Sequence, residues 1–592
     1  MTAGGFRLSA AHEWVAHDPF GRVKPADAAA QPEGAAGAPG EVQLRAARNG
    51  YASFRVLVTG AGEYRLAASA RCGLEVDLFK AWYHRMHQAE GQPAAWWPDA
   101  LVPVHGGAAF RLPDPENRIE GQTAQEFWVD VFIPPEAKPG RAAGRLRLTA
   151  GGGATELPFS VEILEAGLPD EPCVQMDNNS YGSKWLVGLY PEAFARAASG
   201  PRWQARTIEL LQHHYRLIHE HRATFHNLGA GHSGGFDPIY GPRLAGRGRE
   251  LRLEGWELFD RHYGPLLDGS AFRRRLPGSP PPRRPAAPVW GVYTPINPDW
   301  PASYLWWGEP GYGVEFTRGV GQFDAHLRAN GWTGSRLEFF FNHKKRYRWF
   351  EWDGDEVKYA KDDAYHLEMG RLLKQATAGS PVKWVYRMDA SWQMKNQFDR
   401  LAGSTNFWVC GGFLRWYPEE VRRVLGRGDI VWWYGGTPSI AAATSSILQN
   451  LFQTWARGLG GFCAWLTTSP GQDPWFDCEG GTTAVMYPGE RFGIAGPIPS
   501  VRLKVQRNGI QDVDLVDRAA RAAGRLEEVR GSLAQGVPLR LWEPPPRAAL
   551  ELPPEDWDSI NLSAEHEPGR EPLPEPDPSW WARFRQSALA GR

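Results

Sequence analysis

The sequence predicts two folded parts in tandem: an antiparallel β-sandwich over residues 1–170 and a (β/α)8 TIM-like barrel over residues 171–530. Up to about residue 168, short segments of alternating apolar and polar residues are separated by Gly, Pro and Asp, as is typical of a sandwich. From about residue 173, short apolar runs alternate with helical patterns roughly seven or eight times, which predicts a parallel barrel. Residues 531–592 are expected to be a Pro-rich extension that is draped over a domain or partly disordered.

The predicted strands of the sandwich have a period of two, which places one face of each strand on a core. In chain order they are VQLRAARNGYASFRVLV, GEYRLAAS, EFWVDVFIP, GRLRLTA and ELPFSVEIL. The predicted barrel strands are RATFHNLG, PVWGVYTP, RLEFFFNH, VKWVYRMD, TNFWVCGG, DIVWWYGG and GFCAWLTT. Between two of them, DDAYHLEMGRLLKQA predicts an amphipathic helix over residues 362–376 that Asp362 or Asp363 caps.

Residues 272–290 are rich in Pro and Arg, which predicts an irregular surface loop whose charges serve solvation rather than ligand binding.

Charge and composition narrow the class of partner. A formal net charge of -1 and a pI near 7.0 argue against nucleic acid or an anionic membrane surface as the main partner. The amino terminus has no basic segment followed by an apolar run, so the chain as given is expected to be cytoplasmic, with a removed leader as the alternative. Oligomeric state is not predicted by any of these features.

No metal or cofactor is expected. The five Cys are widely spaced without a CxxC pair, and the His-rich run HHYRLIHEHRATFHNLGAGH lacks HExxH and crosses from a helix into a strand. The glycine clusters do not match a phosphate loop or a dinucleotide-binding motif.

Acids, amides and indoles follow the predicted barrel strands, and the carboxyl ends of such strands meet at one rim. Carboxylates and amides bind hydroxyls while aromatic faces stack on the C–H face of a sugar ring, so this set predicts a carbohydrate ligand. A neutral carboxyl can protonate a glycosidic oxygen while a second carboxylate stabilises positive charge on the sugar. The candidates for binding are Asp177, His226, Asn342, His343, Trp352, Trp392, Trp432, Trp433, Tyr434, Trp465 and Trp475.

Adjacent Asp355 and Glu356 are the candidates for catalysis. Neighbouring side chains diverge in an extended segment, so we expect this pair to suit a substrate-assisted reaction rather than two carboxylates that face each other across a bond. The alternative is that DGDE is a solvated turn before a helix, because acidic residues are common in turns.

Two further segments carry a family resemblance. They are QEFWVDVFIPPEAKPGRAAGRLRL in the predicted sandwich and GPIPSVRLKVQRNGIQDVDLVDRA at residues 496–519. Together with the barrel between them, they resemble the glycoside hydrolase family 123 catalytic-domain superfamily. The most specific part of the second segment consists of Pro499, Ser500, Arg502, Leu503, Arg507, Gly509, Asp512 and Asp514.

The resemblance implies a sandwich joined to a barrel and a substrate-assisted glycosidase with an Asp–Glu pair after the fourth barrel strand. Here Asn342 and His343 follow RLEFFF, and the next Asp–Glu pair is Asp355 and Glu356, twelve residues beyond His343. Either a lengthened loop, anchored by burial of its aromatic residues Trp349, Phe350 and Trp352, returns this pair to the site, or chemistry moved to Asp389 and Asp177 on other strands. The N-acetylgalactosamine specificity is not expected to carry over.

We therefore expect a glycoside hydrolase with Glu356 as general acid and Asp355 as stabiliser, and Asp389 as the carboxyl to which chemistry could have moved. A non-catalytic glycan-binding protein that lost the acid is the alternative from another class. A lyase that uses His343 or Tyr434 as base is a third hypothesis.

Overall fold

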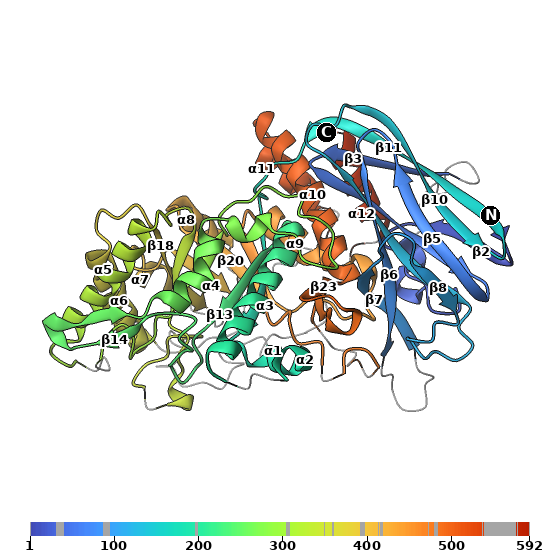
Figure 1. Ribbon diagram of the computed structural model, residues 1–592. Coiled ribbons are helices and arrows are strands. Elements are labelled where there is room, and N and C mark those ends of the chain that lie inside the picture. Colours follow the sequence, from blue (N-terminus) through green and yellow to red (C-terminus); the bar gives the residue numbers. More distant parts are fainter. Residues whose placement is uncertain are drawn as a thin grey trace, which may run out of the picture.

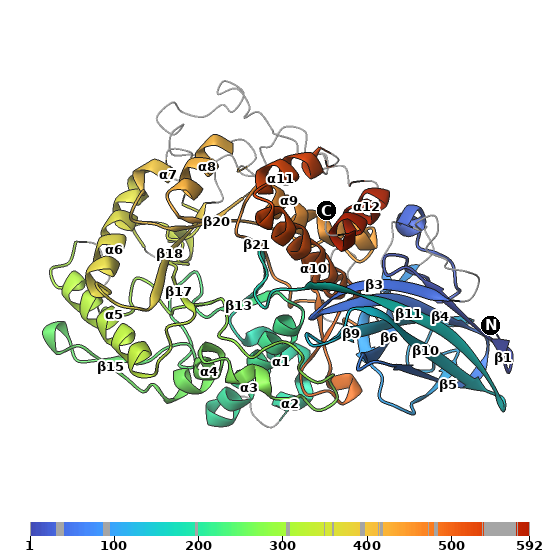
Figure 2. The same ribbon diagram turned by 90° about the horizontal axis from the view of Figure 1, so that it is seen from above.

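The computed structural model describes residues 2–30, 41–86, 95–195, 199–303, 308–348, 350–357, 360–390, 397–411, 414, 418–471, 473–476, 478, 483–535, 537, 576 and 578–590. Two large sheets lie at one end of the molecule and a strand ring surrounded by helices lies at the other, with helix α10 (Val501–Ala522) between them (Figures 1 and 2).

The first part contains a six-stranded and a five-stranded sheet. The six-stranded sheet is antiparallel, in the order β1 (Thr2–Ala3), β2 (Phe6–Ala11), β4 (Gly50–Thr59), β9 (Ala124–Ile133), β6 (Glu75–Met86) and β7 (Ala95–Pro103). The five-stranded sheet has the order β3 (Val42–Arg48), β11 (Gly153–Gly167), β10 (Gly140–Ala150), β5 (Gly62–Ala70) and β8 (Ala109–Leu112). One hydrophobic cluster takes side chains from both sheets, among them Phe54 and Val129 of the first and Leu146 and Phe159 of the second.

One pairing differs from the predicted antiparallel pattern, because β3 runs parallel to β11. The alternating pattern of VQLRAAR identifies a strand with one buried face, but strand direction depends on a partner that is distant in sequence.

The second part is a parallel eight-stranded sheet that is nearly closed into a barrel. Its order is β13 (Thr224–Leu228), β12 (Gln175–Tyr181), β21 (Gly461–Ala464), β20 (Ile430–Gly435), β19 (Phe407–Cys410), β18 (Lys383–Ala390), β17 (Arg336–Phe339) and β16 (Gly291–Tyr293). In the described residues no strand ladder joins β13 to β16, but Nε2 of His226 lies 2.9 Å from the carbonyl oxygen of Gly291 and bridges that gap.

Helices surround the strand ring (Figure 2). In chain order they are α1 (Lys184–Leu189), α2 (Pro191–Phe194), α3 (Gly200–Glu220), α4 (Glu257–Leu267), α5 (Tyr312–Ala329), α6 (Asp363–Ala376), α7 (Gln397–Arg400), α8 (Pro418–Gly426) and α9 (Leu448–Ala456). Short two-stranded sheets are formed by β14 (Arg243–Ala245) with β15 (Arg252–Glu254), and by β22 (Met486–Pro488) with β23 (Pro497–Pro499). None of the described helices is both long enough and apolar enough to span a membrane.

Helix α6 matches the predicted helix, and one of the two predicted residues, Asp362, is at the N-cap position. Its side chain, however, does not bond to the helix backbone and instead accepts hydrogen bonds from Nζ of Lys345. The carboxylate of Asp363 binds Gln397 and Arg400. Both carboxylates are therefore used for tertiary contacts.

Helix α10 and its N-cap residue carry the signature residues except Pro499, and the charged ones bind other elements. Arg502 forms an ion pair with Asp99 of β7 at 2.8 Å. Asp514 accepts from Arg222 at 2.8 Å and from the backbone N–H of Cys173 at 2.8 Å. Ser500 caps the helix by accepting from the backbone N–H of Leu503 at 3.0 Å.

Two more signature positions explain how closely α10 packs. Lys504 and Arg507 share the buried carboxylate of Asp130 on β9, at 2.5 and 2.7 Å. A Cβ atom at Gly509 would overlap a methyl carbon of Leu448, so a larger residue would have to displace that side chain where α10 meets α9. The signature therefore joins the sheets to the barrel.

The prediction for residues 272–290 is wrong in one respect, since two of its charges form specific contacts. Arg283 binds the carboxylate of Asp77 with two nitrogens, and Arg284 donates to the carbonyl oxygens of His219 and Asp170. These arginines tie the loop to the first sheet and to the end of α3.

Most of residues 531–592 lies outside the described residues. The described part contains the end of α11 (Leu526–Ala534) and helix α12 (Pro578–Ala590). Trp580, Trp581 and Phe584 of α12 pack against Phe452 of α9, so this end of the chain is docked as a helix.

Candidate active site

Polar side chains from several strand ends meet at the carboxyl edge of the barrel. Tyr181, the last residue of β12, donates from its hydroxyl to Oδ1 of Asn342, which follows β17, at 2.5 Å. The same hydroxyl lies 2.8 Å from Nε2 of His232, which follows β13. Nδ2 of Asn342 donates to the carbonyl oxygen of Ala230 at 2.8 Å, which orients its Oδ1 toward the tyrosine.

The loop after β17 returns to this edge because its aromatic residues are buried. Trp352 is fully buried and stacks on Tyr365 with ring centroids 5.3 Å apart. The ring of His343 lies 4.3 Å from Trp352 and 4.6 Å from Phe350. The backbone N–H groups of Gly354 and Asp355 donate to the carbonyl oxygen of His343, at 3.0 and 3.3 Å. The described residues within 343–355 therefore form a compact loop.

Asp355 and Glu356 converge on one ammonium group. Nζ of Lys344 lies 3.1 Å from Oδ2 of Asp355 and also forms an ion pair with Glu356. The expectation of an extended segment with diverging side chains is wrong here, because Glu356 has a φ of 49°, in the left-handed region. Burial lowers the pKa of Lys344, but Asp355 and Glu356 raise it, and the net pKa lies above its ordinary value.

Asp389 on β18 is a third carboxyl beside this pair. It is buried, and Arg387 holds it through two nitrogens at 2.6 and 3.0 Å. Burial raises the pKa of Asp389, Arg387 lowers it, and the charges of Asp355 and Glu356 raise it, to about 6. Asp389 therefore holds a proton over a higher pH range than an ordinary carboxyl.

A ladder of buried charges leads from the barrel interior to Asp389. Nδ1 of His226 lies 3.2 Å from Asp177, and Nε2 lies 3.0 Å from Glu338. Glu338 lies 3.3 Å from Nη1 of Arg387, which binds Asp389. Burial lowers the pKa of His226, but the charges of Asp177 and Glu338 raise it by more than burial lowers it, to about 10. The imidazole of His226 is therefore charged at neutral pH. We call Asp177, His226, Glu338, Arg387 and Asp389 the charge ladder.

The predicted aromatic residues are distributed over several places. Trp465 follows β21, is 36% exposed, and contacts Tyr181 with ring centroids 5.1 Å apart. Tyr434 is near the carboxyl end of β20 and packs on the cluster inside the barrel that contains Trp432. Trp432 itself is fully buried and packs on Trp290, at 4.6 Å between centroids.

The structure does not bring four other predicted residues to the edge. Trp433 faces α9, where its Nε1 donates to Thr454, because successive side chains alternate between the two faces of a strand. Trp475 packs against Trp82 of β6. His343 and Trp352 are buried within their own loop, and Trp392 lies outside the described residues.

Sequence reasoning did not select three residues that shape the site: Glu338, Lys344 and Arg387. A charged residue inside an otherwise apolar strand, as in RLEFFF and VKWVYRMD, is the signal that could have identified Glu338 and Arg387. The contact between Lys344 and the acidic pair depends on how the loop folds.

No group of three or more His, Cys, Asp or Glu side chains is arranged to hold a metal ion in the part of the chain that the structure describes.

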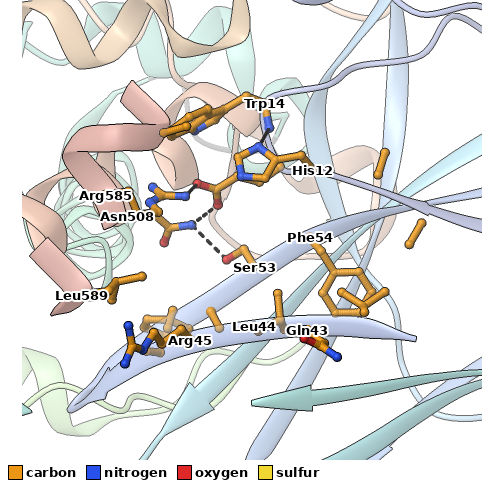
Figure 3. A pocket seen from close by; sticks show the side chains of 18 of the residues that line it. His12, Trp14, Gln43, Leu44, Arg45, Ser53, Phe54, Asn508, Arg585 and Leu589 are labelled. Atoms are coloured by element: carbon orange, nitrogen blue, oxygen red, sulfur yellow. Dashed lines mark hydrogen bonds and ion pairs between the residues drawn. The ribbon is translucent and has the colours of Figure 1, made fainter. Parts of the chain in front are cut away.

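A cavity of about 770 Å³ lies away from the barrel edge, between strands β2, β3 and β4 and helix α12 (Figure 3). Its polar side chains bind one another: Asn508 donates to Glu13 and Ser53, and Arg585 binds Glu13 and Asp512. These contacts join α10 and α12 to the sheets, and we do not place chemistry there.

Comparison with known proteins identifies the fold. The chain is similar to a family 123 glycoside hydrolase from Clostridium perfringens, described in terms of glycolipid glycan hydrolysis, with 13% identity and a TM-score of 0.61 over 99% of this chain and 98% of that one. This likeness shows the fold, and it confirms the resemblance read from the sequence at that level.

Two other solved structures are less similar. They are Bacteroides uniformis β-glucuronidase 3 (10% identity, 79% of this chain and 51% of that one, TM-score 0.28) and a Parabacteroides merdae β-glucuronidase (7% identity, 79% and 50%, TM-score 0.28). At these TM-scores they carry no argument. No protein-family model and no curated protein sequence matches the chain.

Proposed function

We propose that the protein is a glycoside hydrolase whose active site is the carboxyl edge of the barrel. One observation carries the proposal: three carboxyl groups, Asp355, Glu356 and Asp389, interact at an edge where Tyr181 and Trp465 offer aromatic surface. Cleavage of a glycosidic bond needs a proton donor and a negative group for the oxocarbenium-like centre, and this cluster contains both.

Glu356 is the better-placed proton donor. Its side chain is 35% exposed, so it can reach a leaving oxygen, whereas both oxygens of Asp389 are occupied by Arg387. Asp355 lies deeper, with Oδ2 3.4 Å from His232, and is suited to stabilise positive charge or to orient a 2-acetamido group. The charges of Asp355 and Glu356 help to raise the pKa of Asp389 to about 6, so Asp389 supplies a carboxyl beside the acidic pair that is neutral at mildly acidic pH.

A second candidate function follows from Lys344. Its ion pairs neutralise both members of the acidic pair in the resting site, as expected if the pair now serves only to hold a loop. Under that alternative the protein binds a glycan without cleaving it.

The test is release of aryl alcohol or reducing ends from a panel of aryl glycosides and oligosaccharides. We expect Glu356→Gln to lose about 100-fold or more in kcat while remaining folded, the ordinary range for removal of a general acid. Glu368→Gln is the matched control, since Glu368 pairs with Arg371 on the outer surface of α6. The control should keep full activity.

The Asp389→Asn variant tests whether Glu356 or Asp389 is the proton donor. Activity that survives in Glu356→Gln and disappears in Asp389→Asn would move the proton donor to β18. Binding of a glycan by wild type without any cleavage would favour the binding-protein alternative. A wild-type protein that neither binds nor cleaves any member of the panel would refute the proposal.

A further inference from the structure

Exposed aromatic side chains are rare in this protein. Among the described Phe, Tyr and Trp residues, only Phe20, Tyr347 and Trp465 are exposed, at 36%, 52% and 36%. Phe20 belongs to the sheet part of the molecule, whereas Tyr347 and Trp465 both lie at the carboxyl edge of the barrel. Two exposed rings at one edge offer flat apolar faces of the kind that stack on sugar rings.

The two exposed rings are the ends of one continuous line of rings. Tyr347 lies 5.0 Å from His232, His232 lies 5.5 Å from Tyr181, and Tyr181 lies 5.1 Å from Trp465, all measured between ring centroids. The four residues come from segments after β17, β13 and β21 and from the end of β12. We call this set the aromatic line.

The carboxyl groups lie beside the middle of the aromatic line. Nε2 of His232 is 3.4 Å from Oδ2 of Asp355. Burial raises the pKa of Tyr181, and the charges of Asp355 and Asp389 raise it further, so both carboxyls are near this ring. Asp355 and Asp389 therefore lie beside the two inner rings, His232 and Tyr181, whereas Tyr347 and Trp465 are the outer rings of the line.

Backbone hydrogen bonds and an ion pair hold the segment that carries Tyr347 in place. The backbone N–H of Tyr347 donates to the carbonyl oxygen of Lys344 at 3.0 Å, and that of Lys344 donates to the carbonyl oxygen of His232 at 3.0 Å. Arg348 binds Asp299 at 2.5 Å. These contacts hold the segment that carries Tyr347 against the loops after β13 and β16.

We propose that Tyr347 and Trp465 are stacking platforms for two different sugar residues, and that the site takes an oligosaccharide with sugar residues on both sides of the carboxyl groups. The placement of the cleaved bond between them rests on the proposed function. An aromatic face stacks on one pyranose at a time, and two rings separate the platforms, so a single sugar cannot cover both. The guanidinium of Arg346 lies 4.9 Å from the centre of the Tyr347 ring; at this exposed position the contact is weak enough for a sugar to displace.

The test measures binding against chain length. The probes are defined series from one to six residues of chito-, malto-, cello-, manno- and galacto-oligosaccharides, titrated by calorimetry into the Glu356→Gln protein so that turnover does not consume them. We expect affinity for at least one series to rise by about tenfold or more between one and four residues.

Tyr347→Ala and Trp465→Ala, each added to that protein, should lose about tenfold in affinity for the longer members, while Tyr347→Phe keeps it. Phe20→Ala is the matched control and should change nothing, because Phe20 is as exposed as Trp465 but lies on the sheet part. Longer members that bind equally well to all variants would overturn the inference, as would the absence of binding in every series.

These outcomes are distinct from failure of the proposed hydrolase activity. Length-dependent binding that both alanine variants weaken, without cleavage by wild type, would support the stacking role of the aromatic line and refute the hydrolase activity. Cleavage by wild type that neither alanine variant alters would support the hydrolase activity and refute the stacking role of the aromatic line.

Discussion

Replacing His226 by glutamine tests whether the charge ladder works as a set of ion pairs. His226 is fully buried between Asp177 and Glu338, at 3.2 and 3.0 Å. Glutamine can still donate to the carbonyl oxygen of Gly291, so the bridge between β13 and β16 is retained while the positive charge is removed.

The magnitude can be worked in two ways. The pKa of His226 rises from 6.5 to about 10, and at about 1.4 kcal/mol per unit the shift corresponds to about 5 kcal/mol of stability. Removing one partner of a buried ion pair costs about 3–5 kcal/mol in general. The two figures agree, so we expect the His226→Gln protein to lose about 3–5 kcal/mol of unfolding free energy near pH 6.

The dependence on pH has a definite sign. Because the folded pKa is raised, the stabilisation is fully present below pH 6.5 and is lost as pH rises toward 10. The difference between wild type and His226→Gln, measured by urea unfolding, should therefore shrink by about 4 kcal/mol between pH 6 and pH 10.

His213→Gln is the matched control. Burial lowers the pKa of His213 to about 4, although the carbonyl oxygen of Ala495 accepts from its ring, so it is a buried neutral histidine above pH 6. Only the unfolded state of this side chain binds a proton near pH 6, so the cost of His213→Gln should rise by less than about 1 kcal/mol between pH 6 and pH 10, opposite in sign to the change for His226→Gln. A His226→Gln cost that is flat or rises over this range, or that is smaller than about 1 kcal/mol at pH 6, would refute the ion-pair account.

Two further predictions concern other strained or buried groups. Asp130→Asn leaves Lys504 and Arg507 buried without their carboxylate and should cost about 3–5 kcal/mol in urea unfolding, whereas Glu209→Gln, in an exposed pair, should cost less than about 1 kcal/mol; equal costs would contradict the role of α10 as a buried joint. Glu356→Gly should be more stable than Glu356→Ala by about 1 kcal/mol in thermal unfolding, because only glycine adopts a φ of 49° without strain; an alanine variant as stable as the glycine variant would argue against a left-handed backbone at this position.

Local pattern predicted which segments form strands and helices. The alternation in EFWVDVFIP and the helical spacing in DDAYHLEMGRLLKQA come from each segment having to bury one face, and β9 and α6 occupy these segments. The direction of each strand and the identity of its neighbouring strand could not be predicted from local pattern. The parallel pairing of β3 with β11 depends on contacts between residues more than 100 positions apart, such as Val42 with Phe159.

Sequence pattern also placed residues at strand ends without deciding which of them meet. Trp432 and Trp433 are neighbours in one apolar run, yet one packs inside the barrel and the other against α9, since a shift of one residue reverses the face of a strand. The resemblance to family 123 directed attention to the segment that became α10, but only the structure showed that its charged residues join the sheets to the barrel.

The sequence by itself determined that one part of this protein is built from sheets and the other from strands alternating with helices. It also determined which acidic and aromatic residues follow the barrel strands, because both features depend on spacing along the chain. Tertiary structure decided that Asp355 and Glu356 meet at Lys344 beside Asp389, and that Tyr347 joins Trp465 in one line of rings. The physical reason is that these contacts join side chains from separate loops, whose relative positions are set by closure of the barrel and by aromatic burial within the loop after β17.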